Sequence, residues 1–139
     1  MAPSLGTGEC PTDQLSGFQK YILNGFETHN HCGPATASVT LGSKTDQITG
    51  GSCATNAAGY SVSIGTQLLG SPTTAQEPDL LIITVNPTTG GGSISSVVAH
   101  THWVLNAHPV VFGTGKLSGT FTGVSALTGA KAHGSFKCA

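Results

Sequence analysis

The chain has 139 residues, which is long enough for one domain with a packed core. Charged residues make up only 8% of it, the net charge is −1, and the five basic residues are all lysines. This composition argues against a nucleic-acid partner, because phosphate recognition relies on clustered Arg and Lys. No apolar run is long enough to cross a bilayer as a helix. The chain also starts without the basic and apolar stretches of a signal peptide.

The first predicted element is a short amphipathic helix within an N-terminal extension, residues 1–34. Thr12 or Asp13 would cap its start, and Asn24-Gly25 would end it. Its apolar side would consist of Leu15, Phe18, Tyr21 and Ile22, which recur at helical spacing. Cys10 precedes this helix and Cys32 follows it, so the two cysteines would tether both of its ends.

From residue 35 the apolar residues alternate with polar ones, which is the period of β-strands. Turn signals rich in Gly and Pro separate these stretches, and the run 80–85 is apolar throughout, as in a buried central strand. The predicted strands cover residues 37–41, 60–64, 80–85, 94–106, 110–112, 117–122 and 132–138, and a further short strand through Ile48 follows a turn at residues 42–44. This pattern predicts an all-β domain over residues 35–139, with an antiparallel β-sandwich or a barrel-like sheet.

The four cysteines indicate two disulfides and an oxidising compartment, because the chain is small, weakly charged and has no Cys-x-x-Cys motif. Three pairings are possible, and sequence order alone does not decide between them. We favour Cys10–Cys32 with Cys53–Cys138, which would contribute about 3 and about 4 to 5 kcal/mol in the loop-entropy model.

Two regions of the chain match the motifs of a known family. The first runs from Ala37-Ser38-Val39-Thr40-Leu41 through Asp46-Gln47-Ile48-Thr49-Gly50 and Cys53 to Asn56-Ala57-Ala58-Gly59-Tyr60-Ser61-Val62-Ser63-Ile64-Gly65. The second runs from Lys116-Leu117-Ser118-Gly119-Thr120-Phe121-Thr122-Gly123-Val124 to Ser135-Phe136-Lys137-Cys138. With these motifs, residues 35–139 resemble the LpqH-type mycobacterial surface lipoprotein antigen family.

The resemblance implies a surface-exposed antigen or adhesin of the cell envelope with no known catalysis. It also supports the Cys53–Cys138 pair, because the matching family cysteines lie at the start and the end of the domain. In that family a lipid is attached to an N-terminal Cys. Here Glu9 precedes Cys10 and His31 precedes Cys32, where a lipidation motif has Gly or Ala, so we expect only the globular module to carry over.

The six histidines suggest a metal site in a chain with so few charges. His29 and His31 are two residues apart, as are His100 and His102, and this spacing places both rings of a pair on one strand face. The two pairs could together offer four nitrogen ligands to Zn²⁺ or Cu²⁺. We favour the alternative of partly exposed histidines with ordinary hydrogen bonds, since we identify no carboxylate near them in the sequence as a ligand or a hydrogen-bond partner.

The sequence favours a protein that is not an enzyme. Asp13, Asp46 and Asp79 lie in turn or cap contexts, and no Gly-x-Ser-x-Gly elbow or phosphate loop occurs. Trp103 is a candidate surface aromatic that would stack on a carbohydrate, together with Phe112, Phe121 and Tyr60. The alternative, which we favour, is that these four residues form the core.

The favoured hypothesis is a secreted or envelope-surface module that acts in adhesion or in recognition of a host protein or glycan. A second hypothesis is a structural protein of an assembly, such as a phage decoration or tail component in a virion, with many contacts between copies or neighbours. A third is a small metal-binding protein that uses the His pairs. No other cofactor is indicated.

Overall fold

The computed structural model describes residues 10–11, 13–23, 25–56, 59–69, 79–85, 92–98, 101–106, 110–113, 117–125 and 129–138. These residues form twelve strands, and none of them lies in a helix. The strands are β1 (Phe18–Leu23), β2 (Phe26–His31), β3 (Thr36–Leu41), β4 (Lys44–Thr49), β5 (Gly51–Asn56), β6 (Gly59–Leu68), β7 (Leu80–Val85), β8 (Gly92–Val98), β9 (Thr101–Asn106), β10 (Val111–Phe112), β11 (Ser118–Val124) and β12 (Lys131–Lys137).

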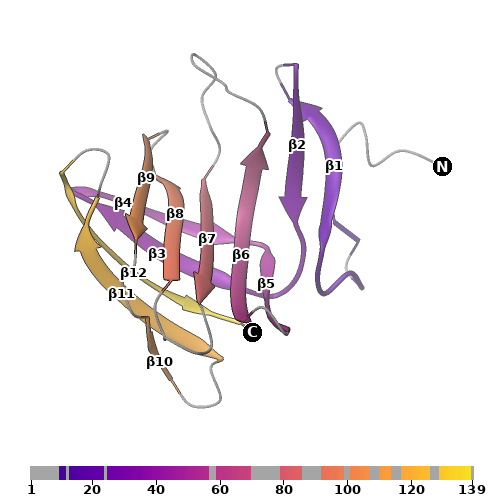
Figure 1. The fold of residues 1–139 in the computed structure, drawn as a ribbon. Helices are drawn as coiled ribbons and strands as arrows, with labels where there is room; N and C mark the ends of the chain where they lie inside the picture. The colour runs from indigo at the N-terminus through magenta and orange to yellow at the C-terminus, as the bar shows by residue number, and fades with distance from the viewer. Residues whose placement is uncertain are drawn as a thin grey trace.

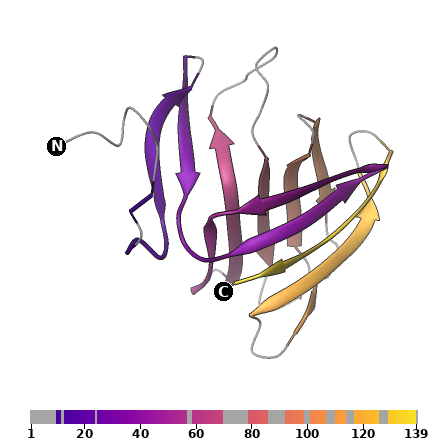
Figure 2. The ribbon, with the colours of Figure 1, turned by 180° about the vertical axis from the view of Figure 1, so that it is seen from behind.

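The strands form two antiparallel sheets that pack face to face (Figure 1). The first sheet has the order β1-β2-β6-β7-β8-β9, with β5 as a further partner of β6. The second sheet has the order β10-β11-β12-β3-β4, and its strands run across those of the first sheet (Figure 2). The expected all-β fold with antiparallel sheets is therefore confirmed, and the packing is that of a sandwich.

The core lies between the two sheets and is supplied by alternate residues of each strand. On β3 the buried side chains are Ala37, Val39 and Leu41, as the alternation predicts. The largest fully buried side chains are Trp103 from the first sheet and Phe136 from the second. Full burial of such side chains typically stabilises a fold by about 1.5–3 kcal/mol each.

Strand β7 has the central position that its apolar run predicts, between β6 and β8. Four of its side chains are buried, whereas Ile82 is half-buried and Thr84 is exposed on the outer face. The expectation of full burial is thus correct for most of the strand and wrong at Thr84.

The predicted N-terminal helix is wrong for the described residues. Phe18, Tyr21 and Ile22 lie in β1, which pairs with β2 in a hairpin that places Leu23 opposite Phe26. Asn-Gly is the preferred sequence for a two-residue hairpin turn, and Gly25 has a φ of +84°. The Asn24-Gly25 pair therefore favours a hairpin over the end of a helix.

The predicted long strand over residues 94–106 is wrong as well. It is divided into β8 and β9, which pair antiparallel with Val98 opposite Thr101. A tight hairpin thus replaces one continuous strand, and the two halves cover neighbouring positions of the same sheet. The Gly- and Pro-rich turn signals at residues 71–78 and at Gly90-Gly91 lie outside the described residues.

The hairpin of β1 and β2 extends the first sheet beyond the area covered by the second sheet (Figures 1 and 2). It is held by β6, which pairs with β5 through residues 59–64 and with β2 through residues 66–68. Gly65 lies between these two stretches with a φ of +99°. A Cβ there would come within 2.3 Å of the Asp79 carbonyl oxygen, so only glycine fits this position.

Candidate recognition surface

The outer face of the second sheet is formed mostly by hydroxyl-bearing side chains. Phe121 and Phe136 point into the core, so their neighbours Thr120, Thr122 and Ser135 point outward. The register continues these rows across the sheet: Thr120 lies opposite Ser135 and Ser135 opposite Ser38, while Thr122 lies opposite His133 and His133 opposite Thr40. We call these six residues, Ser38, Thr40, Thr120, Thr122, His133 and Ser135, the hydroxyl face. Figure 2 shows the strands that carry it in front of the first sheet.

Two hydrogen bonds fix one side of the hydroxyl face. The Oγ1 atoms of Thr40 and Thr45 are 2.8 Å apart, and Gln47 Nε2 donates to Ser38 Oγ at 3.0 Å. These bonds join β3 to β4. Among the described residues, the hydroxyls of Thr120, Thr122 and Ser135 have no side-chain partner. Hydroxyls that face solvent in this way can both donate to a ligand and accept from it.

A hollow of about 600 Å³ opens on this face. It is lined by the hydroxyl face together with Val111, Phe121 and Gly134. A Cβ at Gly134 would lie 2.5 Å from the Phe121 ring, so this glycine lets the ring pack directly against β12. Among the residues that the structure describes, no Lys, Asp or Glu lines the hollow. The nearest lysines along β12 are Lys131 and Lys137, at the two ends of the strand.

The predicted disulfides are both present. Cys10–Cys32 joins the segment before β1 to the end of β2, and Cys53–Cys138 joins β5 of the first sheet to the residue that follows β12 of the second. The hydroxyl of Tyr60 lies 3.2 Å from Cys138 Sγ. Two disulfides are typical of proteins that mature in an oxidising, extracellular environment.

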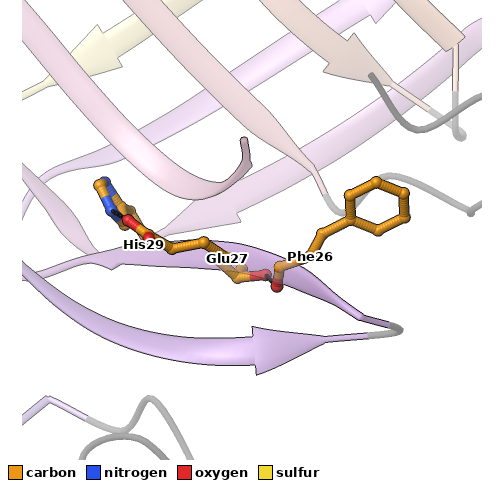
Figure 3. A network of polar contacts seen from close by, with 4 residues as sticks. Phe26, Glu27 and His29 are labelled. Carbon is orange, nitrogen blue, oxygen red and sulfur yellow. Dashed lines mark hydrogen bonds and ion pairs between the residues drawn. The ribbon is translucent and has the colours of Figure 1, made fainter. Parts of the chain in front are cut away.

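The histidines on β2 lie in a polar cluster on the outer face of the first sheet. The rings of Phe18 and His29 are stacked with centroids 3.9 Å apart. His29 Nε2 lies 2.9 Å from Oε2 of Glu27 on the same strand (Figure 3). Glu27 is only two residues from His29 in the chain, so the expectation that no carboxylate serves these histidines is wrong. Burial lowers the pKa of His31, and the nearby His29 lowers it further, whereas a hydrogen bond that the ring donates to the Gln67 side chain raises it.

The two His-x-His pairs do not meet. His29 and His31 lie on β2, whereas His102 lies on β9, and three strands separate β2 from β9. Four strand spacings of about 4.8 Å place them roughly 19 Å apart. The strand order therefore keeps His102 apart from the pair on β2 and gives the shared four-nitrogen site no support. His100 lies outside the described residues, which contain no group of three or more His, Cys, Asp or Glu residues arranged to hold a metal ion.

The four aromatic residues belong to the core, which is the alternative that we favour. The prediction that they form a carbohydrate-stacking surface is wrong. Trp103 is 0% exposed and its ring centroid lies 6.1 Å from that of Phe121. Tyr60 and Phe112 pack edge to face at 5.0 Å. Trp103 faces inward because it alternates with outward residues on β9. It does not contribute to a recognition surface.

The hydroxyl face is not among the sites predicted from the sequence. Its signal is present in the chain: Ser38 and Thr40 flank the buried Val39, and Thr120 and Thr122 flank the buried Phe121. Among the described residues, no helix is both long and apolar enough to cross a membrane. Comparisons of this chain with protein families, curated proteins and solved structures found no match.

Proposed function

We propose that this protein is a non-enzymatic recognition module, secreted or exposed at a cell surface, that binds a neutral glycan on its hydroxyl face. The observation that carries the proposal is the hollow of about 600 Å³ on that face. Its volume lies in the range of small-ligand sites, about 300–1,000 Å³. Adhesion through such a site agrees with the family resemblance of residues 35–139.

The chemistry of the hollow suits a neutral, hydroxyl-rich ligand. Ser and Thr hydroxyls donate and accept hydrogen bonds, as sugar hydroxyls do, so donors and acceptors can be matched on both sides. A charged ligand would lose hydration without gaining a lysine or carboxylate countercharge, because no described Lys, Asp or Glu lines the hollow. The methyl groups of the threonines and the exposed side chain of Val111 offer apolar contacts to the C–H groups of a sugar ring.

Affinity electrophoresis with dextran, mannan, galactan and chitin oligomers tests the proposal, with heparin as a charged comparison. We expect at least one neutral glycan to retard the protein and heparin not to do so. The double variant Thr120→Val/Thr122→Val keeps the side-chain shape and removes two hydroxyls. At about 1 kcal/mol per hydrogen bond, it should weaken binding roughly 30-fold.

The matched control is Thr84→Val, which makes the same change at an exposed position on β7 of the other sheet. This variant should bind like the unaltered protein. Retardation by heparin alone, or equal binding by the Thr120→Val/Thr122→Val and Thr84→Val variants, would contradict the proposal.

A second candidate function is a structural role in an assembly, such as a virion. It is favoured by three exposed apolar side chains on and beside β10 and β11, namely Val111, Leu117 and Val124. Val111 lies on β10, Leu117 directly precedes β11 and Val124 ends it, so these side chains could contact neighbouring molecules along this edge of the sheet. Light scattering separates the two roles, because the recognition module should be monomeric while an assembly component should form a defined oligomer.

A further inference from the structure

Strand β1 is a free edge of the first sheet. It is the terminal strand in the order of that sheet, and its only partner among the described residues is β2. Cys32 N donates to Gly17 O at 2.9 Å. Gly17 and every second residue after it therefore direct their backbone N–H and C=O groups toward β2. In this alternation Phe18, Lys20 and Ile22 direct their N–H and C=O groups away from β2. An incoming strand would find these groups unpaired.

The same three residues carry their side chains on one face of the sheet, because they alternate along β1. Phe18 is 42% exposed and Ile22 is 60% exposed, and the exposed Lys20 lies between them. Leu15, which precedes the strand, is 65% exposed. The free edge therefore presents an apolar, basic, apolar pattern to a strand that pairs with it.

Lys20 has no acidic partner among the described residues. The nearest carboxylate on this face is Glu27, which lies opposite Ile22 on β2 and contacts His29 at 2.9 Å instead. A positive charge at the centre of an edge strand disfavours pairing with a second positive charge and favours pairing with a negative one. The charge thus selects the chemistry of the partner.

The edge is held in place before any partner arrives. Cys10–Cys32 links the segment before β1 to the end of β2, and the ring of Phe18 stacks on His29. The two strands pair over six residues each. An edge that is already ordered loses little conformational entropy when a peptide binds to it.

We propose that β1 binds an extended peptide segment of a partner protein by strand addition, and that this segment places an acidic residue between two apolar ones. Main-chain hydrogen bonds to Phe18, Lys20 and Ile22 would supply affinity, and the side chains would supply specificity. This site is separate from the hydroxyl face, so it stands or falls independently of glycan binding.

The test uses a fluorescent, end-blocked peptide Thr-Val-Thr-Glu-Thr-Val-Thr and a matched peptide with Lys in place of Glu. Fluorescence anisotropy with the whole protein at low salt should show tighter binding of the Glu peptide, by roughly fivefold, from one exposed charge pair. Lys20→Glu should reverse this preference. Lys44→Glu makes the same charge change on β4, which is an edge strand of the other sheet. This variant should keep the preference for the Glu peptide.

Ile22→Pro removes one outward N–H without removing a bond to β2, and it should abolish binding of both peptides. Amide shifts of the unaltered protein should change at residues 18–22 when the Glu peptide is added. Equal binding of the two peptides, no reversal by Lys20→Glu, or shifts confined to other strands would overturn the proposal. Concentration-dependent dimerisation that Ile22→Pro removes would overturn it too, by assigning the edge to a second copy.

Discussion

Two glycines with positive φ differ in the space around them. Gly42 has a φ of +62° and nothing within 4 Å of an added Cβ, whereas Gly65 has a φ of +99° and would place a Cβ 2.3 Å from the Asp79 carbonyl oxygen. Both positions disfavour an L side chain, but only Gly65 also creates a collision with backbone. The comparison separates conformational strain from steric overlap.

We predict that Gly42→Ala lowers the free energy of unfolding by about 1 kcal/mol, from its φ alone. Gly65→Ala should lower it by roughly 3 kcal/mol or more, because the Asp79 backbone must also move. Urea denaturation followed by Trp103 fluorescence measures both. Equal losses for the two variants would show that the contact at Gly65 is relieved without cost.

The lowered pKa of His31 makes stability depend on pH in a defined direction. Burial and the neighbouring His29 hold this pKa below the ordinary value of 6.5. Below pH 6.5 the unfolded chain binds a proton at His31 that the folded protein excludes, so the folded state loses stability as the pH falls. The loss stops once the pH is below the folded-state pKa.

We predict that His31→Gln reduces this dependence, because glutamine does not titrate. The difference in unfolding free energy between the variant and the unaltered protein should be constant above pH 7 and should shift in favour of the variant between pH 6.5 and 5. Urea titrations at half-unit pH steps measure the difference. A difference that stays constant down to pH 5 would contradict the lowered pKa.

At the scale of elements, the two disulfides act on different parts of the molecule. Cys10–Cys32 spans 22 residues and closes the β1–β2 hairpin, which is attached to β6 by only three residue pairs. Cys53–Cys138 spans 85 residues and joins the two sheets. In the loop-entropy model these would contribute about 3 and about 4.5 kcal/mol.

Replacing Cys10 and Cys32 by Ala should therefore increase hydrogen exchange in β1 and β2 while β6 and β7 keep their protection. Replacing Cys53 and Cys138 by Ala should lower protection throughout both sheets. Hydrogen exchange detected by mass spectrometry distinguishes these outcomes. Uniform loss of protection in the first variant would mean that the hairpin is an integral part of the core.

The sequence alone predicts those strands whose period is unambiguous. Alternation marks β3 and β11, and a continuous apolar run marks β7. The N-terminal segment is ambiguous because the apolar spacing of Phe18, Tyr21 and Ile22 suits a helix as well as a strand. The division of residues 94–106 is hidden because neither Gly nor Pro stands between Val98 and Thr101.

At the scale of the whole molecule, the alternation of inward and outward residues along the strands produces a buried core and an outer surface. Inward residues of both sheets bury Trp103 and Phe136, and outward residues of the second sheet form the hydroxyl face. Single strands in the sequence indicate the outward hydroxyls, but only the register of β11, β12 and β3 brings them into one array. For this reason the candidate site could not be recognised from the sequence, although each of its residues could be assigned to the outside of a strand.

We propose the hydroxyl face as the surface with which this protein recognises its ligand. The most direct test records amide chemical shifts of the labelled protein during titration with a neutral glycan selected by affinity electrophoresis. We predict shifts that cluster at Ser38, Thr40, Thr120, Thr122, His133 and Ser135. Shifts confined to the first sheet, or the absence of saturable shifts with any neutral glycan, would contradict the account.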